Sequence, residues 1–322
     1  MKIFKFLSKF FSFLFILLFI TVSSKAQSAM PKRPKITGVA HAAFFTKDLD
    51  NTRQFFKDYM GFAEPIVVNS NQGQIALTII KINDRQFVEL FPERSEGTNR
   101  LYHFAIETDD AEAMRVYLEA KGFKVPQTTP KGRTGNSNYT VTDPNGVICE
   151  IVQYEPDGMT ARNYGQDMPD TRISTRMSHV GFMCPDLDRA VEFYTGVLEF
   201  REVWRGGRDG KKINWVHLQV PEGNETIELM LYDEEPTWAR MGTMNHICLE
   251  VKDVFAAEKI LDGRTPPKDC REHTTPSVGI NKKRQVNYYT IDGTRVEIME
   301  DDTIDGIPAP SSTGTPMKYT GQ

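Results

Sequence analysis

The sequence has little cysteine and no large excess of one charge. Its four cysteines include no CxxC pair and follow no regular spacing, which argues against a structural zinc knot and against a thioredoxin-type site. The net charge is −4 at neutral pH, so no positive surface for nucleic acid is expected. We expect all four cysteines to be free thiols, mostly buried, even in an oxidising compartment. They are Cys149, Cys184, Cys248 and Cys270.

The sequence also lacks an apolar run long enough to cross a membrane. The apolar run near the N-terminus covers residues 10–22, whereas a membrane-spanning helix needs about 20 residues. Three lysines precede this run, and the small residues at positions 24 and 26 suit cleavage before Gln27. This pattern is typical of a secretory signal peptide over residues 1–26. We therefore expect a periplasmic or secreted bacterial protein without stable membrane insertion.

Histidine recurs in one local pattern. Four of the six histidines lie in short runs of apolar and small residues that favour a β-strand. These runs are GVAHAAFF, RLYHFAIE, RMSHVGFM and TMNHICLE, and they contain His41, His103, His179 and His246. Their spacing of roughly 60 to 75 residues indicates an internal repeat.

A glutamate follows each of these histidines in a second apolar run. The interval is 47 to 51 residues, and the glutamates are Glu89, Glu150, Glu228 and Glu297. A single strand histidine or glutamate is usually structural or solvent-facing. Four matched pairs are harder to explain in that way, and imidazole with carboxylate is a donor set that divalent transition metals bind. The sequence therefore predicts that the chain holds metal.

An amphipathic helix is expected between the two runs of each repeat. Helices are predicted near residues 49–59, 111–122, 189–200 and 254–263, each preceded by an aspartate that can cap the first turn. Three strand-like runs follow each helix. Each repeat is thus predicted to be a β-α-β-β-β module, and the fold class is α+β with four modules.

The modules alternate between two types. The first and third share a DL-x5-F-[FY] helix, whereas the second and fourth share an Asn-Tyr strand and an Asp-Gly or Asp-Pro-Asn-Gly turn. Aligning these turns places Asn138 on Asn287 and Tyr139 on Tyr288. A polar stretch with glycine and proline separates the two pairs of modules. We expect one domain over residues 36–155, a linker over residues 156–171, a second domain over residues 172–302 and a flexible tail over residues 303–322.

The repeated modules resemble those of the vicinal oxygen chelate superfamily, which includes glyoxalase I, the bleomycin resistance proteins and the extradiol dioxygenases. The resemblance covers about residues 36–300. It implies that two modules close into an open barrel around one metal, so this chain would form two paired open-barrel domains. It also implies that the first and last strands of each module supply the ligands. These would be His41, Glu89, His103 and Glu150 in one barrel, and His179, Glu228, His246 and Glu297 in the other.

The resemblance implies a metal-dependent enzyme that acts on a small oxygen-chelating substrate. Two imidazoles and two carboxylates suit Fe²⁺, Mn²⁺, Zn²⁺, Co²⁺ or Ni²⁺. The activity expected first is that of a glyoxalase-like isomerase or lyase, in which a metal-bound glutamate removes a proton next to a carbonyl. Glu297 and Glu150 are the candidate catalytic bases. Export argues against glutathione as the co-substrate.

Two other functions are compatible with the same resemblance. An extradiol-type dioxygenase would bind iron or manganese through His179, His246 and Glu297. The sequence departs from that pattern, because it lacks the histidine ahead of the tyrosine and the proline in the turn before the glutamate. A non-catalytic protein that sequesters its ligand, as bleomycin resistance proteins do, would not need the metal ligands that all four modules retain.

Residues outside these ligand sets carry weaker hypotheses. His217 is interpreted either as a general base near the second site or as a surface strand residue. Tyr139 and Tyr288 are expected to pack rather than to point into a cavity. Arg133, with Lys211 and Lys212, suggests an anionic or polyhydroxyl ligand. The oligomeric state stays open.

Overall fold

The computed structural model describes residues 30–95 and 100–321 of the chain. Contacts divide the chain into a unit of residues 1–30 and a unit of residues 31–322, and the second unit contains all the helices and strands described below. The predicted signal peptide lies outside the described residues. Within the described part, no helix is long and apolar enough to cross a membrane.

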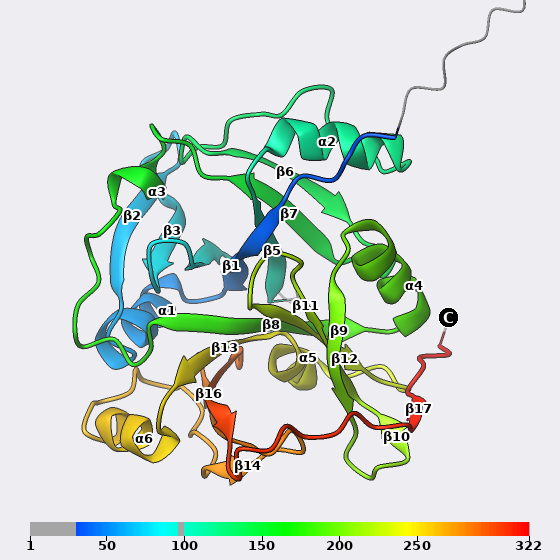
Figure 1. Cartoon of the computed structure of the whole chain (residues 1–322). Coiled ribbons are helices and arrows are strands. Elements are labelled where there is room, and N and C mark those ends of the chain that lie inside the picture. The colour runs from blue at the N-terminus through cyan, green and yellow to red at the C-terminus, as the bar shows by residue number, and fades with distance from the viewer. Residues whose placement is uncertain (1–29, 96–99, 322) are drawn as a thin grey trace, which may run out of the picture. The chain divides into compact units, whose positions relative to one another are not determined.

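The first half of this unit is built on a seven-stranded sheet. Its first module begins with β1, which pairs in parallel with β4 and antiparallel with β5, the first strand of the second module. The strand order is β2-β3-β4-β1-β5-β7-β6 (Figure 1). The strands are β1 (Ile36–Thr46), β2 (Ala63–Asn69), β3 (Ile75–Lys81), β4 (Phe87–Pro92), β5 (Leu101–Thr108), β6 (Ser137–Thr142) and β7 (Ile148–Gln153).

The second half repeats this plan in an eight-stranded sheet. Its order is β14-β15-β16-β13-β8-β12-β11-β9, so the central strands β12-β8-β13-β16 correspond to β4-β1-β5-β7. The paired two-domain α+β fold expected from the repeats is confirmed. The strands are β8 (Arg176–Cys184), β9 (Arg201–Gly206), β11 (Trp215–Gln219), β12 (Thr226–Leu231), β13 (His246–Val251), β14 (Ser277–Val278), β15 (Lys283–Tyr289) and β16 (Arg295–Thr303).

A helix follows the first strand of every module, and each begins at an aspartate cap. Asp48, Asp110, Asp186 and Asp253 accept a hydrogen bond from the backbone N–H three residues later. The helices of the first and third modules end in a π-helical turn, which the sequence pattern did not predict. The helices are α1 (Leu49–Gln54) with η1 (Phe55–Tyr59), α2 (Ala111–Ala120), α4 (Leu187–Val191) with η2 (Glu192–Val197) and α6 (Val254–Asp262).

The apolar faces of both sheets share one core. Phe104 of β5 stacks on Phe182 of β8 with ring centroids 5.0 Å apart, and both rings are buried. Strand side chains alternate between faces, so the neighbouring His103 points to the opposite face from Phe104. β1 and β8 contact each other, and they lie near the middle of Figure 1. The core therefore fixes the sheets on one face and leaves the other face for the histidines.

Two expectations about strands differ from the structure. The second module has only two strands after its helix, because residues 121–136 form turns and a single bridge between Lys131 and Ser137. In the fourth module the corresponding strand, β14, has only two residues. These stretches are rich in Pro, Gly and Thr, and proline cannot donate to a strand ladder.

The C-terminal segment also differs from the flexible tail expected for residues 303–322. β16 runs on to Thr303, and β17 (Thr315–Pro316) pairs with β10 (Lys212–Ile213). The Met317 N–H donates to the carbonyl of Ile213 over 3.0 Å. The segment is held because it supplies backbone partners to β10 and the Met317 side chain to the core. Two short helices, α3 (Met159–Arg162) in the linker and α5 (Trp238–Met244) before β13, were likewise not predicted.

Gly61, which follows the first helix, lies very close to the linker backbone. Gly61 has φ +80°, and a Cβ added there would lie 2.0 Å from the carbonyl oxygen of Thr171. Gly73 has a similar φ of +78° with no atom within 4 Å of such a Cβ. We predict that Gly61→Ala lowers the free energy of unfolding by about 2–4 kcal/mol, because strain and collision add, and Gly73→Ala by about 1 kcal/mol. Denaturant unfolding of both variants checks this. Equal losses would contradict the close approach at Gly61.

Candidate metal centres

The N-terminal cluster is formed by His41, His103, Glu89 and Glu150. The Nε2 atoms of the two histidines lie 3.0 Å apart. A Glu89 carboxylate oxygen lies 3.8 Å from His41 Nε2 and 3.7 Å from His103 Nε2. For Glu150 the corresponding distances are 3.7 and 3.4 Å. The four side chains predicted from the repeats therefore meet at one place in the first half.

Sheet order explains why these four residues converge. The strands that carry them are the four central neighbours β4, β1, β5 and β7. Ala43, two residues after His41, pairs directly with His103, so both histidines lie on the same sheet face. Residues that are 109 positions apart in the sequence, from His41 to Glu150, thus become neighbours through strand pairing alone.

The surroundings of this cluster favour neutral imidazoles. Burial lowers the pKa of His41 well below its usual range, and the nearby His103 adds to this effect. Burial also lowers the pKa of His103 to about 4. A neutral imidazole keeps a nitrogen lone pair available, which is the form that binds a metal.

The two carboxylates of the cluster lack a compensating charge. Burial, together with Glu150, raises the pKa of Glu89 well above its usual range, and burial raises that of Glu150 to about 7. The amide of Asn138 donates to Glu150 over 2.9 Å, but among the described residues no lysine or arginine lies within 4.0 Å of either carboxylate. A cation between the two carboxylates would favour their ionised form. The donor set fits a divalent metal of the first transition row.

The C-terminal cluster is formed by His179, His246, Glu228 and Glu297. The histidine Nε2 atoms lie 3.1 Å apart. Glu297 lies 3.2 Å from His179, and Glu228 lies 3.1 Å from His246. The remaining histidine–glutamate distances are 3.9 and 3.6 Å. The second predicted ligand set is therefore also brought together, with all four side chains buried.

Cationic and polar neighbours distinguish the C-terminal cluster from the N-terminal one. His217 Nε2 lies 3.0 Å from a Glu228 oxygen, and its Nδ1 lies 3.1 Å from the hydroxyl of Thr226. The Arg295 guanidinium lies 2.7 Å from His246 Nε2 and 3.9 Å from Glu228. Burial alone would raise the pKa of Glu297, but the charge of Arg295 and a hydrogen bond from His179 lower it to about 2.

The two clusters also differ in their access to cavities. A cavity of about 630 Å³ is lined by Glu89, His103 and Glu150 of the N-terminal cluster, with Tyr102 and Arg133. A second cavity of about 400 Å³ meets the C-terminal cluster only at His179.

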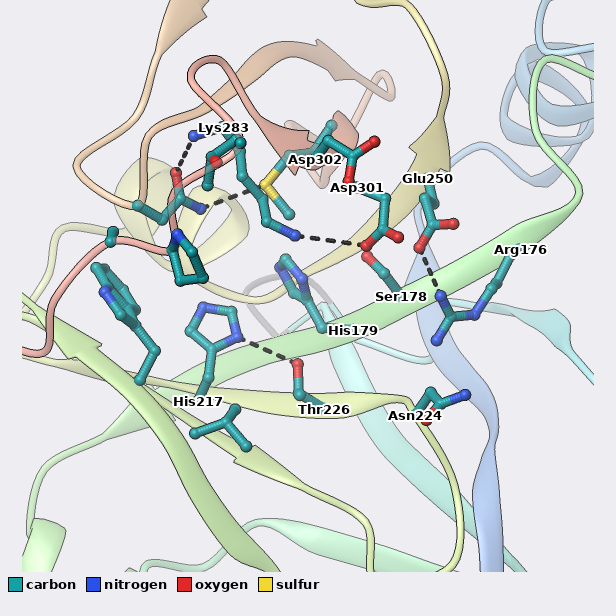
Figure 2. Close-up of a pocket in the computed structure, with 18 residues that line it drawn as sticks. Arg176, Ser178, His179, His217, Asn224, Thr226, Glu250, Lys283, Asp301 and Asp302 are labelled. Carbon is teal, nitrogen blue, oxygen red and sulfur yellow. Dashed lines mark hydrogen bonds and ion pairs between the residues drawn. The ribbon is translucent and has the colours of Figure 1, made fainter.

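Figure 2 shows this second cavity, with His179 on β8, His217 on β11, and Lys283, Asp301 and Asp302 on the opposite side. Strand β12, which carries Thr226, lies between β8 and β11. Three of the four N-terminal ligand residues thus line a cavity, against one of the four C-terminal ones.

Of the candidate residues outside the ligand sets, two lie at a cluster or its cavity and the others do not. His217 lies in the C-terminal site, and Arg133 lines the N-terminal cavity. Lys211 and Lys212 are exposed and line neither cavity; Lys212 pairs with Asp233. Tyr139 and Tyr288 pack in the shared core, as expected.

The strand pairing does not match the sequence alignment of Asn138 with Asn287. Asn287 pairs directly with Glu297, whereas Asn138 pairs two residues past Glu150 and reaches that carboxylate diagonally. The paired residues that flank the turn are six positions apart in both modules, Thr142 with Ile148 and Tyr289 with Arg295, so the two asparagines differ in their distance from the turn.

Arg295 is the site residue that sequence reasoning missed. It lies two residues before Glu297 on β16, and strand alternation places residues i and i+2 on the same face. That spacing was the available signal. The four cysteines are free, with Cys149, Cys184 and Cys248 buried and Cys270 partly buried, as expected.

Comparison with known families agrees with this geometry. The model of the Glyoxalase/Bleomycin resistance protein/Dioxygenase superfamily matches residues 38–151 and 176–305. The chain therefore belongs to this superfamily, and each match covers one of the two clusters. No protein with a curated description matches the chain in sequence.

Solved structures share the fold at low sequence identity. The Mn(II)-bound glyoxalase from Novosphingobium aromaticivorans is 17% identical, with a TM-score of 0.64 over 88% of each chain. A 2,3-dioxygenase from Pseudomonas sp. KL28 is 16% identical, with a TM-score of 0.63 over 89% of this chain and 99% of that one. An extradiol ring-cleaving dioxygenase from B. fuscum is 15% identical, with a TM-score of 0.62 over 89% and 77%. These similarities show the fold.

The two clusters lead to a prediction about metal content. At saturating Mn²⁺ we expect two ions per chain, because each cluster offers two imidazoles and two carboxylates. Replacing His41 and His103 together by alanine should remove one ion and leave the other. Equilibrium dialysis with elemental analysis measures both values. A maximum of one ion that persists in the double variant would refute the prediction.

Proposed function

We propose that this protein is a divalent-metal-dependent enzyme of glyoxalase-like type, an isomerase or lyase for a small oxygen-chelating substrate, and that its reaction takes place at the N-terminal cluster. The observation that carries the proposal is that Glu89, His103 and Glu150 line a cavity of about 630 Å³. Both carboxylates are thus accessible to a ligand, although the cluster itself is buried.

The chemistry follows from the properties of these residues. A bound divalent ion would supply a Lewis acid that stabilises negative charge on a substrate oxygen. His41 and His103 would hold it as neutral nitrogen ligands, with Glu89 as a carboxylate ligand. Glu150 is the proposed base, because the Asn138 amide donates to one of its oxygens over 2.9 Å and leaves the other directed to the cluster.

The proposed proton transfer runs between carbon and Glu150. The carboxylate accepts the proton from the hydroxyl-bearing carbon next to the substrate carbonyl, which gives an enediolate. In an isomerase it returns that proton to the former carbonyl carbon, while the hydroxyl proton passes to the former carbonyl oxygen. Asn138 positions the carboxylate, and Tyr102 and Phe91 form part of the cavity wall. Arg133 lines the same cavity and offers a positive charge to an anionic or polyhydroxyl substrate.

Matched glutamate variants test the proposal. Glu150→Gln removes the base, so we predict that Mn²⁺-dependent deuterium exchange next to the carbonyl of small α-hydroxyketones in D₂O falls by about 10²-fold or more. Glu297→Gln, the equivalent change in the other cluster, should leave exchange within about threefold of wild type. Proton NMR measures the rate. The reverse ranking would assign the reaction to Glu297 and the C-terminal cluster. A protein that binds α-hydroxyketones tightly without metal, and exchanges no proton, would instead be a sequestering protein.

A specific observation supports a second candidate, extradiol-type ring cleavage at the C-terminal cluster. His217 is hydrogen-bonded to Glu228 and lines the cavity of about 400 Å³ beside His179, where it can carry a proton to or from a ligand. His179, His246 and Glu297 would be the metal ligands. Oxygen uptake by the Fe²⁺-loaded protein with catechols tests this, with His217→Phe as the comparison. Absence of uptake would reject the dioxygenase.

We further propose that the chain is exported by its N-terminal signal. The support is the sequence pattern of residues 1–26, with its lysines, apolar run and small residues before Gln27. Expression in a bacterial host, followed by fractionation and N-terminal sequencing, should give a periplasmic protein that starts at Gln27. An intact Met1 in the cytoplasmic fraction would reject export.

A further inference from the structure

The internal repeat allows each residue around one cluster to be compared with its counterpart around the other. Arg295 lies two residues before Glu297 on β16 and pairs directly with His246. The residue two positions before Glu150 on β7 is Ile148. Likewise, His217 pairs with Glu228, whereas Ile79 pairs with Glu89. Two isoleucines in the first half are thus replaced by an arginine and a histidine in the second.

The Arg295 guanidinium lies against the imidazole of His246. One guanidinium nitrogen is 2.7 Å from His246 Nε2 and 2.8 Å from His246 Nδ1. His246 Nδ1 also lies 2.9 Å from the carbonyl oxygen of Met244, to which it can donate. A guanidinium has no electron pair to offer a metal, and it brings a positive charge to the nitrogen that a metal would bind.

The position of His246 depends on a glycine beneath its ring. A Cβ added at Gly181 would lie 1.9 Å from His246 Cε1. In the first half the residue that pairs with His103 is Ala43. The absence of a side chain at Gly181 therefore lets His246 lie against the sheet, within reach of Arg295.

The two clusters also differ in fixed charge. The N-terminal carboxylates have no arginine or lysine within 4.0 Å in the described part of the chain. In the C-terminal cluster Arg295 lies 3.9 Å from Glu228, and only 14% of its side chain is exposed. An arginine stays protonated at all relevant pH values, so its charge opposes an incoming divalent ion.

From these observations we propose that Arg295 is a built-in counter-cation that makes the two clusters unequal. The N-terminal cluster binds a divalent ion first and tightly. The C-terminal cluster binds one only when the Arg295 guanidinium moves away from the His246 ring. At limiting metal the chain therefore carries one ion, in its first half. This order of metal binding does not depend on which reaction the protein catalyses.

Reciprocal exchange of the two counterpart residues tests the inference. Mn²⁺ is titrated into the metal-free full-length mature protein, and the free ion is followed by electron paramagnetic resonance. Wild type should show two classes of site whose dissociation constants differ by about 100-fold or more. Arg295→Ile, which copies the first half, should bring the weak site to within about tenfold of the tight one. Ile148→Arg should weaken the tight site by about 100-fold and leave the weak one in place.

Two controls show whether an effect on metal affinity comes from the charge of Arg295, from the shape of its side chain or from misfolding. Arg295→Lys keeps the charge and should keep the weak site weak, whereas Arg295→Gln removes the charge without adding an apolar side chain and should tighten it. Circular dichroism of each metal-free variant reports the fold, and a misfolded Arg295→Ile leaves the Arg295→Gln and Ile148→Arg comparisons decisive. Equal affinities of the two sites in wild type, or an unchanged weak site in folded Arg295→Gln, would overturn the inference.

Discussion

The close approach of two carboxylates to two buried imidazoles is the interaction on which the rest of this structure depends. In the N-terminal cluster burial keeps His41 and His103 neutral, and it raises the pKa values of Glu89 and Glu150. Both carboxyl groups therefore ionise less readily than usual, and a cation beside them would favour the charged form. A divalent ion resolves this with the donor atoms already present.

The pairing of the strands brings these groups together, and the core holds the sheets in place. The ligands come from four neighbouring strands, so the strand pairing that builds the sheet also fixes the cluster. The opposite strand face supplies Phe104 and Phe182 to a core shared by both halves. The C-terminal cluster has different neighbours. His217 is hydrogen-bonded to Glu228, and the Arg295 guanidinium lies against His246. The two halves thus share the same four residue types at the cluster and differ in the residues beside them.

The fold and the two clusters were largely predictable from the sequence. The internal repeat shows which distant residues have equivalent positions, and local patterns alone do not show this. The histidine–glutamate spacing predicted two sets of side chains that the structure brings together, and the aspartates before each helix predicted its start. The irregular stretch over residues 121–136 and the ordered segment after Thr303 were not predicted, because composition alone does not show which backbone groups find partners. Arg295 was missed since its role depends on the close packing of His246 over Gly181.

The central claim is that the N-terminal cluster is a divalent-metal site of a folded, metal-dependent protein. Anomalous X-ray diffraction at the manganese edge, from crystals grown with one equivalent of Mn²⁺, tests it most directly. We predict the strongest peak among His41, Glu89, His103 and Glu150, with their donor atoms drawn to about 2.0–2.2 Å from the ion. A strongest peak in the C-terminal cluster, or no peak at either cluster, would contradict it.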